Sequence, residues 1–266
     1  MNEADSYYTH DHTGVRYPYG DLFGYPDSLI RGRTEAAYAH GVNLVSTNPS
    51  VVLDYGSGRG HGLLTIQKAF HPDRTISLDK HLPYLEAQQA VLANENPTPF
   101  EFVHSEGIPL PFETGSIEAI FFMHVIEHIK DPGILLEEMR RVLSSDGRLV
   151  IATPNRRNLV GNNPTDEHVF TETELQALLE DSGFDTALFH IVPNEQAWKV
   201  HSRKSALAHR LPLTGRLRDR VPGNIWDSVV LRSGIIRRPL DGADFECADA
   251  HLDTAIDILA LAQKAA

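Results

Sequence analysis

The 266-residue sequence contains a single cysteine, Cys247, and no long apolar run. One cysteine excludes an internal disulfide, and it excludes zinc or iron–sulfur sites that need several thiolates. The apolar runs fall well short of the ~20 residues of a membrane-spanning helix. The amino terminus, MNEADSYYTH, is acidic and polar, which is not the pattern of a secretory signal. These absences predict a soluble, cytoplasmic protein without a membrane span.

Basic residues are also scarce, with 24 Lys+Arg against 36 Asp+Glu and a formal net charge of -12. An acidic chain argues against nucleic acid as a partner. The deficit is uneven, because residues 199–238 hold ten Lys+Arg and only two Asp+Glu. An anionic small-molecule partner therefore stays open. The hydrophobic fraction of 41% is enough to form a core, which excludes disorder as the main state.

Short β-branched or aromatic runs alternate with helical patterns along the middle of the chain. We expect helices over 61–70 and 83–93 and from Pro132 and Thr171 onward, with residues 144–147 ending the third. Strands alternating with helices predict an α/β fold, with a mostly parallel sheet covered on both faces. The predicted strands are 51–55, 75–78, 100–104, 117–123, 148–153, 184–192 and 256–262.

The strongest local signal is a glycine-rich turn between the first predicted strand and the helix that follows it. Asp54 is the last residue but one of the strand, and Gly56, Gly58 and Gly60 follow at alternate positions. Such a turn brings backbone N–H groups and a positive helix end close to a ligand. The dinucleotide pattern G-x-G-x-x-G would need glycine where His61 stands. A nicotinamide cofactor is therefore disfavoured, and a purely structural tight turn is the simpler alternative.

Three more features follow at the ends of later predicted strands. Asp79 lies 21 residues after Gly58, where a carboxylate can bind ribose hydroxyls. The loop 105–112 follows the third strand, and the run 124–128, HVIEH, follows the fourth. In this order the motifs resemble the class I S-adenosylmethionine-dependent methyltransferases, most closely the group with the ubiquinone-biosynthesis O-methyltransferases. The resemblance covers residues 50–192 and the last predicted strand.

The resemblance implies a Rossmann-like, doubly wound sheet of seven strands with an antiparallel last strand. It also implies an inserted segment between the last two strands. By position it assigns the methionine part of the cofactor to Asp54 and the three glycines of the turn, and the ribose to Asp79. The remaining cofactor residues that it implies are Lys80, Glu106, Gly107 and His124.

Two positions depart from the pattern of that family. Glu106 stands where the family usually has aspartate, and Ile117-Glu118 replaces its usual Phe-Asp. Glu106 can also be an exposed loop carboxylate, and Asp79 can be a helix N-cap. These departures concern local packing around the adenine and the fourth strand.

The implied activity is methyl transfer from S-adenosylmethionine to a hydroxyl or amine, for which a base must take the acceptor's proton. His128 and His168 are the candidate bases, with Glu127 beside them, because both histidines follow strands at the ligand-binding edge. The alternative is that Glu127 and His128 brace the loop that follows. His124, Glu127, His128 and His168 can also be interpreted as ligands of Zn²⁺, Mn²⁺ or Fe²⁺, although His124 replaces the glutamate of metal-binding relatives.

The expected organisation has four parts. Residues 1–44 form a cap or lid, 45–194 the cofactor-binding core, 195–246 a basic insertion on the substrate side, and 247–266 the terminal strand. The acceptor class is a sugar, a glycan precursor or a natural product. Leucines between the basic residues leave peripheral membrane contact open. The alternative function is a catalytically silent binding or regulatory subunit that keeps the fold.

Overall fold

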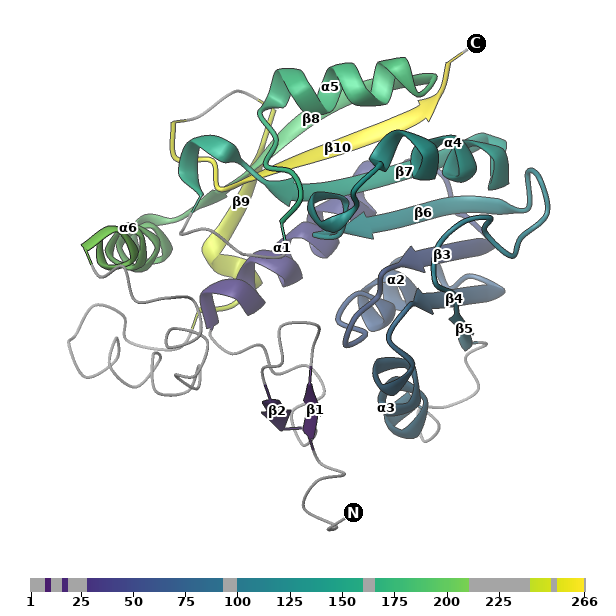
Figure 1. Ribbon diagram of the computed structural model, residues 1–266, viewed down its shortest axis with the longest axis horizontal. Coiled ribbons are helices and arrows are strands. Elements are labelled where there is room, and N and C mark those ends of the chain that lie inside the picture. The colour runs from purple at the N-terminus through teal and green to yellow at the C-terminus, as the bar shows by residue number, and fades with distance from the viewer. Residues whose placement is uncertain are drawn as a thin grey trace.

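An eight-stranded sheet forms the centre of the computed structural model (Figure 1). The structure describes residues 8–10, 16–18, 28–92, 100–159, 166–210, 240–249 and 253–265. The strand order is β5-β4-β3-β6-β7-β10-β8-β9. The bounds are β3 Val51–Tyr55, β4 Arg74–Asp79, β5 Phe100–His104, β6 Ile117–Met123, β7 Leu143–Pro154, β8 Phe184–Pro193, β9 Phe245–Ala248 and β10 Asp257–Lys264.

Strands β3 to β7 pair in parallel, and β10 runs antiparallel to both of its neighbours, β7 and β8. In Figure 1 the arrow of β10 points opposite to those of β3 and β6. The α/β class, the mostly parallel sheet and the antiparallel final strand are thus confirmed. The sheet has one strand more than predicted, because β9 pairs antiparallel with β8 at the edge. Its four residues are too short a run to stand out in the sequence.

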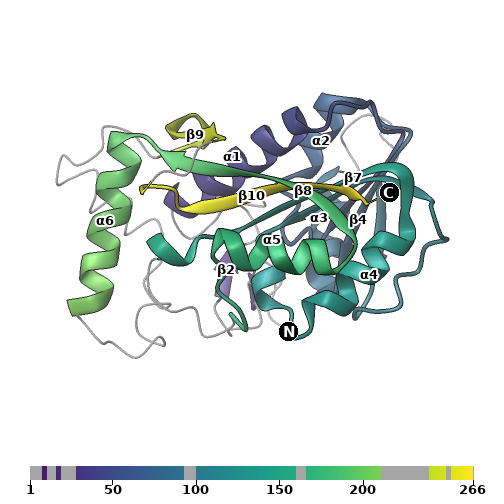
Figure 2. The same cartoon turned by 90° about the horizontal axis from the view of Figure 1, so that it is seen from above.

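Helices cover both faces of the sheet, as Figure 2 shows: α1 and α2 lie on one side, and α4 and α5 on the other. Two apolar clusters fill the layers between the helices and the sheet. The cluster under α1 and α2 includes Phe121, and the one under α4 and α5 includes Phe122, because successive residues of β6 face opposite sides. The helices are α1 Ser28–Leu44, α2 Leu63–Phe70, α3 Leu82–Leu92, α4 Pro132–Val142, α5 Glu172–Asp181 and α6 Glu195–Arg210.

The starts of α4 and α5 differ in how they are capped. Thr171 and Glu174 form the predicted capping box, since each side chain bonds the other residue's backbone N–H. Helix α4 begins at Pro132 as expected, but the Asp131 side chain makes no capping bond. The proline alone therefore fixes the backbone at that start.

The prediction that residues 144–147 end a helix ahead of a strand at 148 was wrong. Helix α4 ends at Val142, and β7 begins at once with Leu143. Ile117 pairs with Leu143 and Ala119 with Arg148, so the register shifts between these two pairs. The Ser-Ser-Asp-Gly run is accommodated as an irregularity within the strand and is not a loop between elements.

The remaining described elements are short. They are β1 Tyr8–His10 and β2 Arg16–Pro18, which pair with each other, and the 3-10 helices η2 Ile126–His128, η3 Arg156–Asn158 and η4 Gly242–Asp244. Most of the predicted lid and residues 211–239 of the basic insertion lie outside the described residues. Within the described part, no helix is long and apolar enough to cross a membrane.

Candidate functional site

The carboxyl ends of β3, β4 and β6 bring the predicted cofactor residues to one edge of the sheet. The turn after β3 places Gly56, Gly58 and Gly60 at φ values of 68°, 55° and 81°. These values lie in the left-handed region that favours glycine. At Gly56 an added Cβ would also lie 2.6 Å from Val125 Cγ2, in the loop after β6. Glycine is therefore required in this turn by the left-handed φ values and, at Gly56, also by the contact with Val125.

Buried polar side chains hold the glycine turn from behind. Gln88 of α3 donates from Nε2 to the Gly58 carbonyl at 2.8 Å and to Ser57 Oγ at 3.1 Å. Ser77 donates a 2.6 Å bond to Gln88 Oε1. Sequence reasoning missed this network, since Gln88 carries no motif and becomes recognisable only once α3 packs behind the turn.

Asp54 is fully buried beneath the turn. Tyr38 Oη donates a 2.7 Å hydrogen bond to Asp54 Oδ1, while Oδ2 has no partner among the described residues. Burial raises the pKa of this carboxyl to about 7; the Tyr38 bond opposes the rise and the charge of Asp79 adds to it. A buried, half-satisfied carboxylate is costly. The arrangement fits a site that receives a cationic group, such as the ammonium of S-adenosylmethionine.

Asp79 lies at the end of β4 and is 8% exposed. Its Oδ2 accepts the Gly58 N–H at 2.8 Å, and its Oδ1 accepts the His81 N–H at 2.8 Å. Each carboxylate oxygen keeps a second lone pair, so these bonds orient the group without exhausting it. Asp79 is not the N-cap of α3, because that helix begins at Leu82 and the Asp79 side chain binds the N–H of His81, which precedes it. The geometry fits a ribose with two hydroxyls.

The other residues predicted to contact the cofactor near Asp79 are more exposed. Lys80 is exposed, and its carbonyl lies 2.9 Å from His104 Nε2. Glu106 is exposed, with Oε1 3.7 Å from His104 Nε2, and Gly107 has φ 140°. The predicted contacts of Lys80, Glu106 and Gly107 with the cofactor stay predictions.

The turn is also electropositive on the side of α1. Burial lowers the pKa of His61 to about 3, and the charges of Arg59 and Arg31 lower it further. The imidazole is therefore neutral at pH 7, and the two guanidinium groups supply the positive charge. Together with the start of α2, this environment suits the carboxylate end of an amino acid.

The loop after β6 carries the predicted catalytic residues. Glu127 is buried, and Thr153 Oγ1 donates a 3.1 Å bond to its Oε2. Burial raises the pKa of Glu127, and the nearby His124 and His128 oppose the rise. His128 Nδ1 lies 3.1 Å from Asp166 Oδ1, and His168 Nε2 lies 3.0 Å from the Lys130 carbonyl.

These contacts join the loop after β6 to the loop that follows η3. The backbone N–H groups of Glu167 and His168 both donate to the Glu127 carbonyl, at 2.8 and 3.0 Å. The structure thus brings Glu127, His128 and His168 together at the predicted edge. It supports the bracing interpretation, while the catalytic roles of these residues stay predictions.

The four residues considered as metal ligands lie near one another, but their side chains are not arranged around a common point. Two of them lie against carboxylates outside the set: His128 Nδ1 is 3.1 Å from Asp166 Oδ1, and His124 Nε2 is 3.3 Å from Asp257 Oδ1. Across the described ranges, no group of three His, Cys, Asp or Glu side chains is placed to hold a metal ion.

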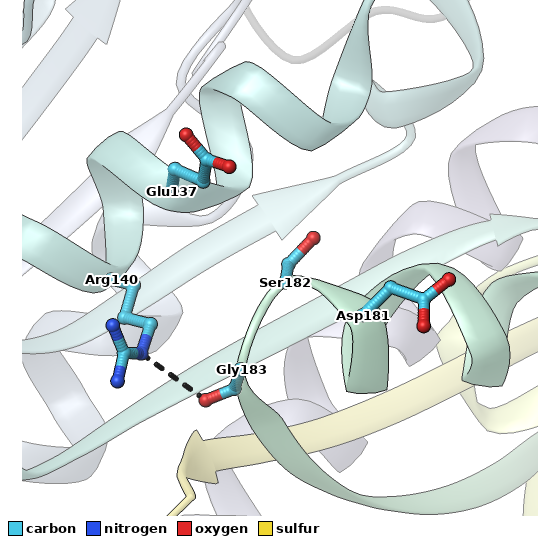
Figure 3. Close-up of a pocket in the computed structure, with 5 residues that line it drawn as sticks. All are labelled: Glu137, Arg140, Asp181, Ser182 and Gly183. Atoms are coloured by element: carbon cyan, nitrogen blue, oxygen red, sulfur yellow. Dashed lines mark hydrogen bonds between the residues drawn. The ribbon is translucent and has the colours of Figure 1, made fainter.

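A surface hollow of about 420 Å³ lies elsewhere, between the ends of α4 and α5 (Figure 3). Arg140 Nε donates a 3.3 Å bond to the Gly183 carbonyl across it, and Glu137, Asp181 and Ser182 complete its lining. Gly183 directly precedes β8, so the hollow lies at the amino edge of the parallel strands. Ligands of open α/β sheets bind at the opposite edge. The hollow is therefore not the cofactor site.

Comparison with known proteins finds similarity to methyltransferases. Residues 53–151 match the family model of a methyltransferase domain. A probable S-adenosylmethionine-dependent methyltransferase of Mycolicibacterium smegmatis is 26% identical over 222 residues, which cover 80% of this chain and 81% of that protein. A 37.1 kDa protein of transposon TN4556 from Streptomyces fradiae is 37% identical over 113 residues, and the match spans only 32% of its length.

Among solved structures, a similar fold occurs in the complex between the Haloferax volcanii Trm112 methyltransferase activator and a methyltransferase. The TM-score is 0.61 at 16% identity, covering 89% of this chain and 92% of that chain. At this identity the likeness shows the fold alone.

A doubly wound sheet with its glycine turn, Asp54 and Asp79 at one carboxyl edge defines a protein of the Rossmann-like class that binds an adenosine-containing cofactor. The matched domain over residues 53–151 and the relatives support a class I S-adenosylmethionine-dependent methyltransferase. It is an enzyme that uses S-adenosylmethionine as its methyl donor.

Proposed function

We propose that this enzyme methylates a hydroxyl or amine of a small molecule, with sugars, glycan precursors and natural products as the acceptor class. The observation that carries the proposal is Asp54: a fully buried carboxylate with one unpartnered oxygen beneath a left-handed glycine turn. A buried carboxylate in this state favours a cationic ligand, and the sulfonium donor brings an ammonium group.

When bound, S-adenosylmethionine supplies an activated methyl group on a sulfonium sulfur. The chain supplies position: Asp54 and the glycine turn on the methionine side, and Asp79 on the ribose side. Holding an acceptor in line with the methyl can contribute several kcal/mol of barrier reduction. The loop joined by Glu127, His128 and His168 shapes the acceptor side of the same edge.

The acceptor class rests on the segments around this edge. The basic segment 199–238 begins in α6, where Lys199 and Arg203 lie in the described part. Guanidinium and ammonium groups favour phosphate or carboxylate on the acceptor. An anionic sugar derivative or carrier-bound intermediate therefore suits the proposal better than a neutral lipid.

Calorimetric titration with S-adenosylmethionine, with NAD as the comparison ligand, tests the cofactor. A low-molecular-mass cell extract incubated with enzyme and methyl-labelled S-adenosylmethionine then tests transfer, read by mass spectrometry as a labelled methyl on an extract component. Binding of NAD in place of S-adenosylmethionine would overturn the proposal. Binding without transfer to any component would favour the catalytically silent subunit.

A further inference from the structure

Three side chains from distant parts of the chain meet beside the loop after β6. Asp257, at the start of β10, accepts a 3.0 Å hydrogen bond from Arg33 Nε on its Oδ2. Arg33 Nη2 also binds Asp257 Oδ1, and His124 Nε2 lies 3.3 Å from that same oxygen. Arg33 and Asp257 are 224 positions apart in the sequence, so only the fold creates this group.

Electrostatic interactions hold Arg33, His124 and Asp257 together. The Asp257 side chain is completely buried, and those of Arg33 and His124 are 18% and 17% exposed. Burial alone would raise the pKa of Asp257, but Arg33 and His124 outweigh it and hold the pKa below its usual value. Asp257 is therefore ionised; Arg33 binds both of its oxygens, and the His124 ring lies against Oδ1. Glu127 is the further charged group near His124.

The backbone of His124 is held in an unusual conformation. Its φ is 55°, the left-handed region that non-glycine residues seldom adopt, and its N–H donates a 2.8 Å bond to the Ala152 carbonyl. Such conformations gather at functional sites, where the surrounding structure enforces them. The neighbouring residue Val125 packs against the position of Gly56, so the loop that begins at His124 passes beside the cofactor turn.

The two ring nitrogens of His124 have different surroundings. Both nitrogens are buried, and neither makes a hydrogen bond of good geometry with a described residue. Nε2 nevertheless lies 3.3 Å from Asp257 Oδ1, close enough for the carboxylate to act on that nitrogen. A carboxylate next to Nε2 favours the tautomer that carries its proton there. Nδ1 then presents a lone pair. By contrast, the ring contacts recorded for His128 and His168 are with Asp166 and with the Lys130 carbonyl.

We propose that His124 is the residue that takes the proton from the acceptor, and that Asp257 and Arg33 position its ring. This inference rests on the proposed methyltransferase function. The acceptor oxygen or nitrogen forms a bond to the methyl carbon while the carbon–sulfur bond breaks and leaves its electron pair on sulfur. The acceptor's proton moves to Nδ1 of His124, and the resulting imidazolium keeps its Nε2 proton facing the Asp257 carboxylate.

The ring state of His124 is measurable without knowing the acceptor. Protein labelled with ¹⁵N in its histidine rings gives long-range ¹H–¹⁵N spectra, in which His124→Asn identifies the signals of His124. Asparagine is chosen because it tolerates a left-handed φ. His71→Asn is the matched control, since His71 is the other described non-glycine residue with positive φ and follows α2 at the opposite edge.

We expect the wild-type protein near neutral pH to show His124 as the Nε2–H tautomer. Asp257→Asn should mix or reverse the tautomers, because an amide can donate to Nε2. Addition of S-adenosylmethionine should shift the His124 Nδ1 resonance and leave that of His71 in place. An Nδ1–H tautomer in the wild type, or an Nδ1 resonance indifferent to bound S-adenosylmethionine, would overturn the proposal.

Methyl transfer into the cell extract provides the catalytic readout. His124→Asn should lower the initial rate by roughly a hundredfold or more, with S-adenosylmethionine affinity within about threefold and His71→Asn at the wild-type rate. Full activity of His124→Asn contradicts the inference alone. A wild-type protein that fails to bind S-adenosylmethionine contradicts the proposed function, and the two failures are thereby distinguished.

Discussion

Tyr38 of α1 donates a 2.7 Å hydrogen bond to Asp54, the buried carboxylate at the end of β3. This bond joins a helix that precedes the sheet to the cofactor turn. Arg33 of the same helix binds Asp257 at the start of the last strand. Helix α1 therefore supports both halves of the site, the cofactor side through Tyr38 and the proposed acceptor side through Arg33.

The affinity for S-adenosylmethionine should depend on pH through Asp54. Burial raises the pKa of this carboxyl to about 7, so the ionised fraction grows as the pH rises through neutrality. An ammonium ligand favours the ionised form, and affinity should therefore increase from about pH 6 to about pH 8. Calorimetric titration across this range measures it. The Asp54→Asn protein should bind weakly with a flat profile, and an equally steep profile in that variant would exclude Asp54 as the cause.

The same carboxyl should lower the stability of the ligand-free protein at high pH. Its folded pKa lies above the unfolded value, so stability is complete below about pH 4 and falls as the pH rises to about 7, by about 1.4 kcal/mol per pH unit at most. Asp54→Asn keeps the acceptor for Tyr38 and removes the charge. Urea unfolding should therefore show the variant to be more stable than wild type at about pH 8 and similar at about pH 4. A variant less stable than wild type at high pH would contradict this.

Gly56→Ala should damage folding and cofactor binding together. Its φ of 68° disfavours alanine, and the new Cβ would meet Val125 at 2.6 Å. The backbone part alone should cost about 1–3 kcal/mol of unfolding free energy. Adding Val125→Ala should restore only the part due to the clash. Thermal denaturation of the single and double variants checks this, and complete recovery in the double variant would rule out the backbone contribution.

Asp257 should govern acid stability. Its folded pKa is depressed, so its contribution is present above the unfolded value of 3.8 and is lost as the pH falls toward the folded pKa. Asp257→Asn removes the carboxylate charge that faces Arg33 and His124 and should cost about 3–5 kcal/mol at neutral pH. Denaturant unfolding should show this deficit shrinking below about pH 4. A deficit independent of pH would instead indicate a packing effect.

The sequence predicts the parts of the fold that depend on local pattern. Strands β5 and β6 have the predicted bounds, and the glycine turn needs only the alternation of Gly56, Gly58 and Gly60 after an apolar run. The Thr171–Glu174 capping box is equally local. The Ser144–Gly147 run misleads, because turn-forming residues also fit an irregular strand when Leu143 pairs with Ile117.

The supports of the site are beyond sequence reasoning because they depend on long-range packing. Tyr38, Gln88 and Arg33 lie on helices, where nothing in the pattern distinguishes them from other polar or aromatic residues. The sequence pattern predicts Asp257 only as a residue near the start of the last strand. Its contact with His124 arises only because β10 inserts between β7 and β8 in the folded sheet.

We propose that this edge of the sheet binds the methyl donor and that Asp54 is part of the binding site. The most direct measurement is calorimetric titration of the wild-type and Asp54→Asn proteins with S-adenosylmethionine near pH 8, with NAD as the comparison ligand. We expect one site per chain in the wild type, a loss of at least about tenfold in affinity in the variant, equivalent to about 1.4 kcal/mol, and no binding of NAD. Equal affinity of the two proteins for S-adenosylmethionine, or binding of NAD alone, would contradict it.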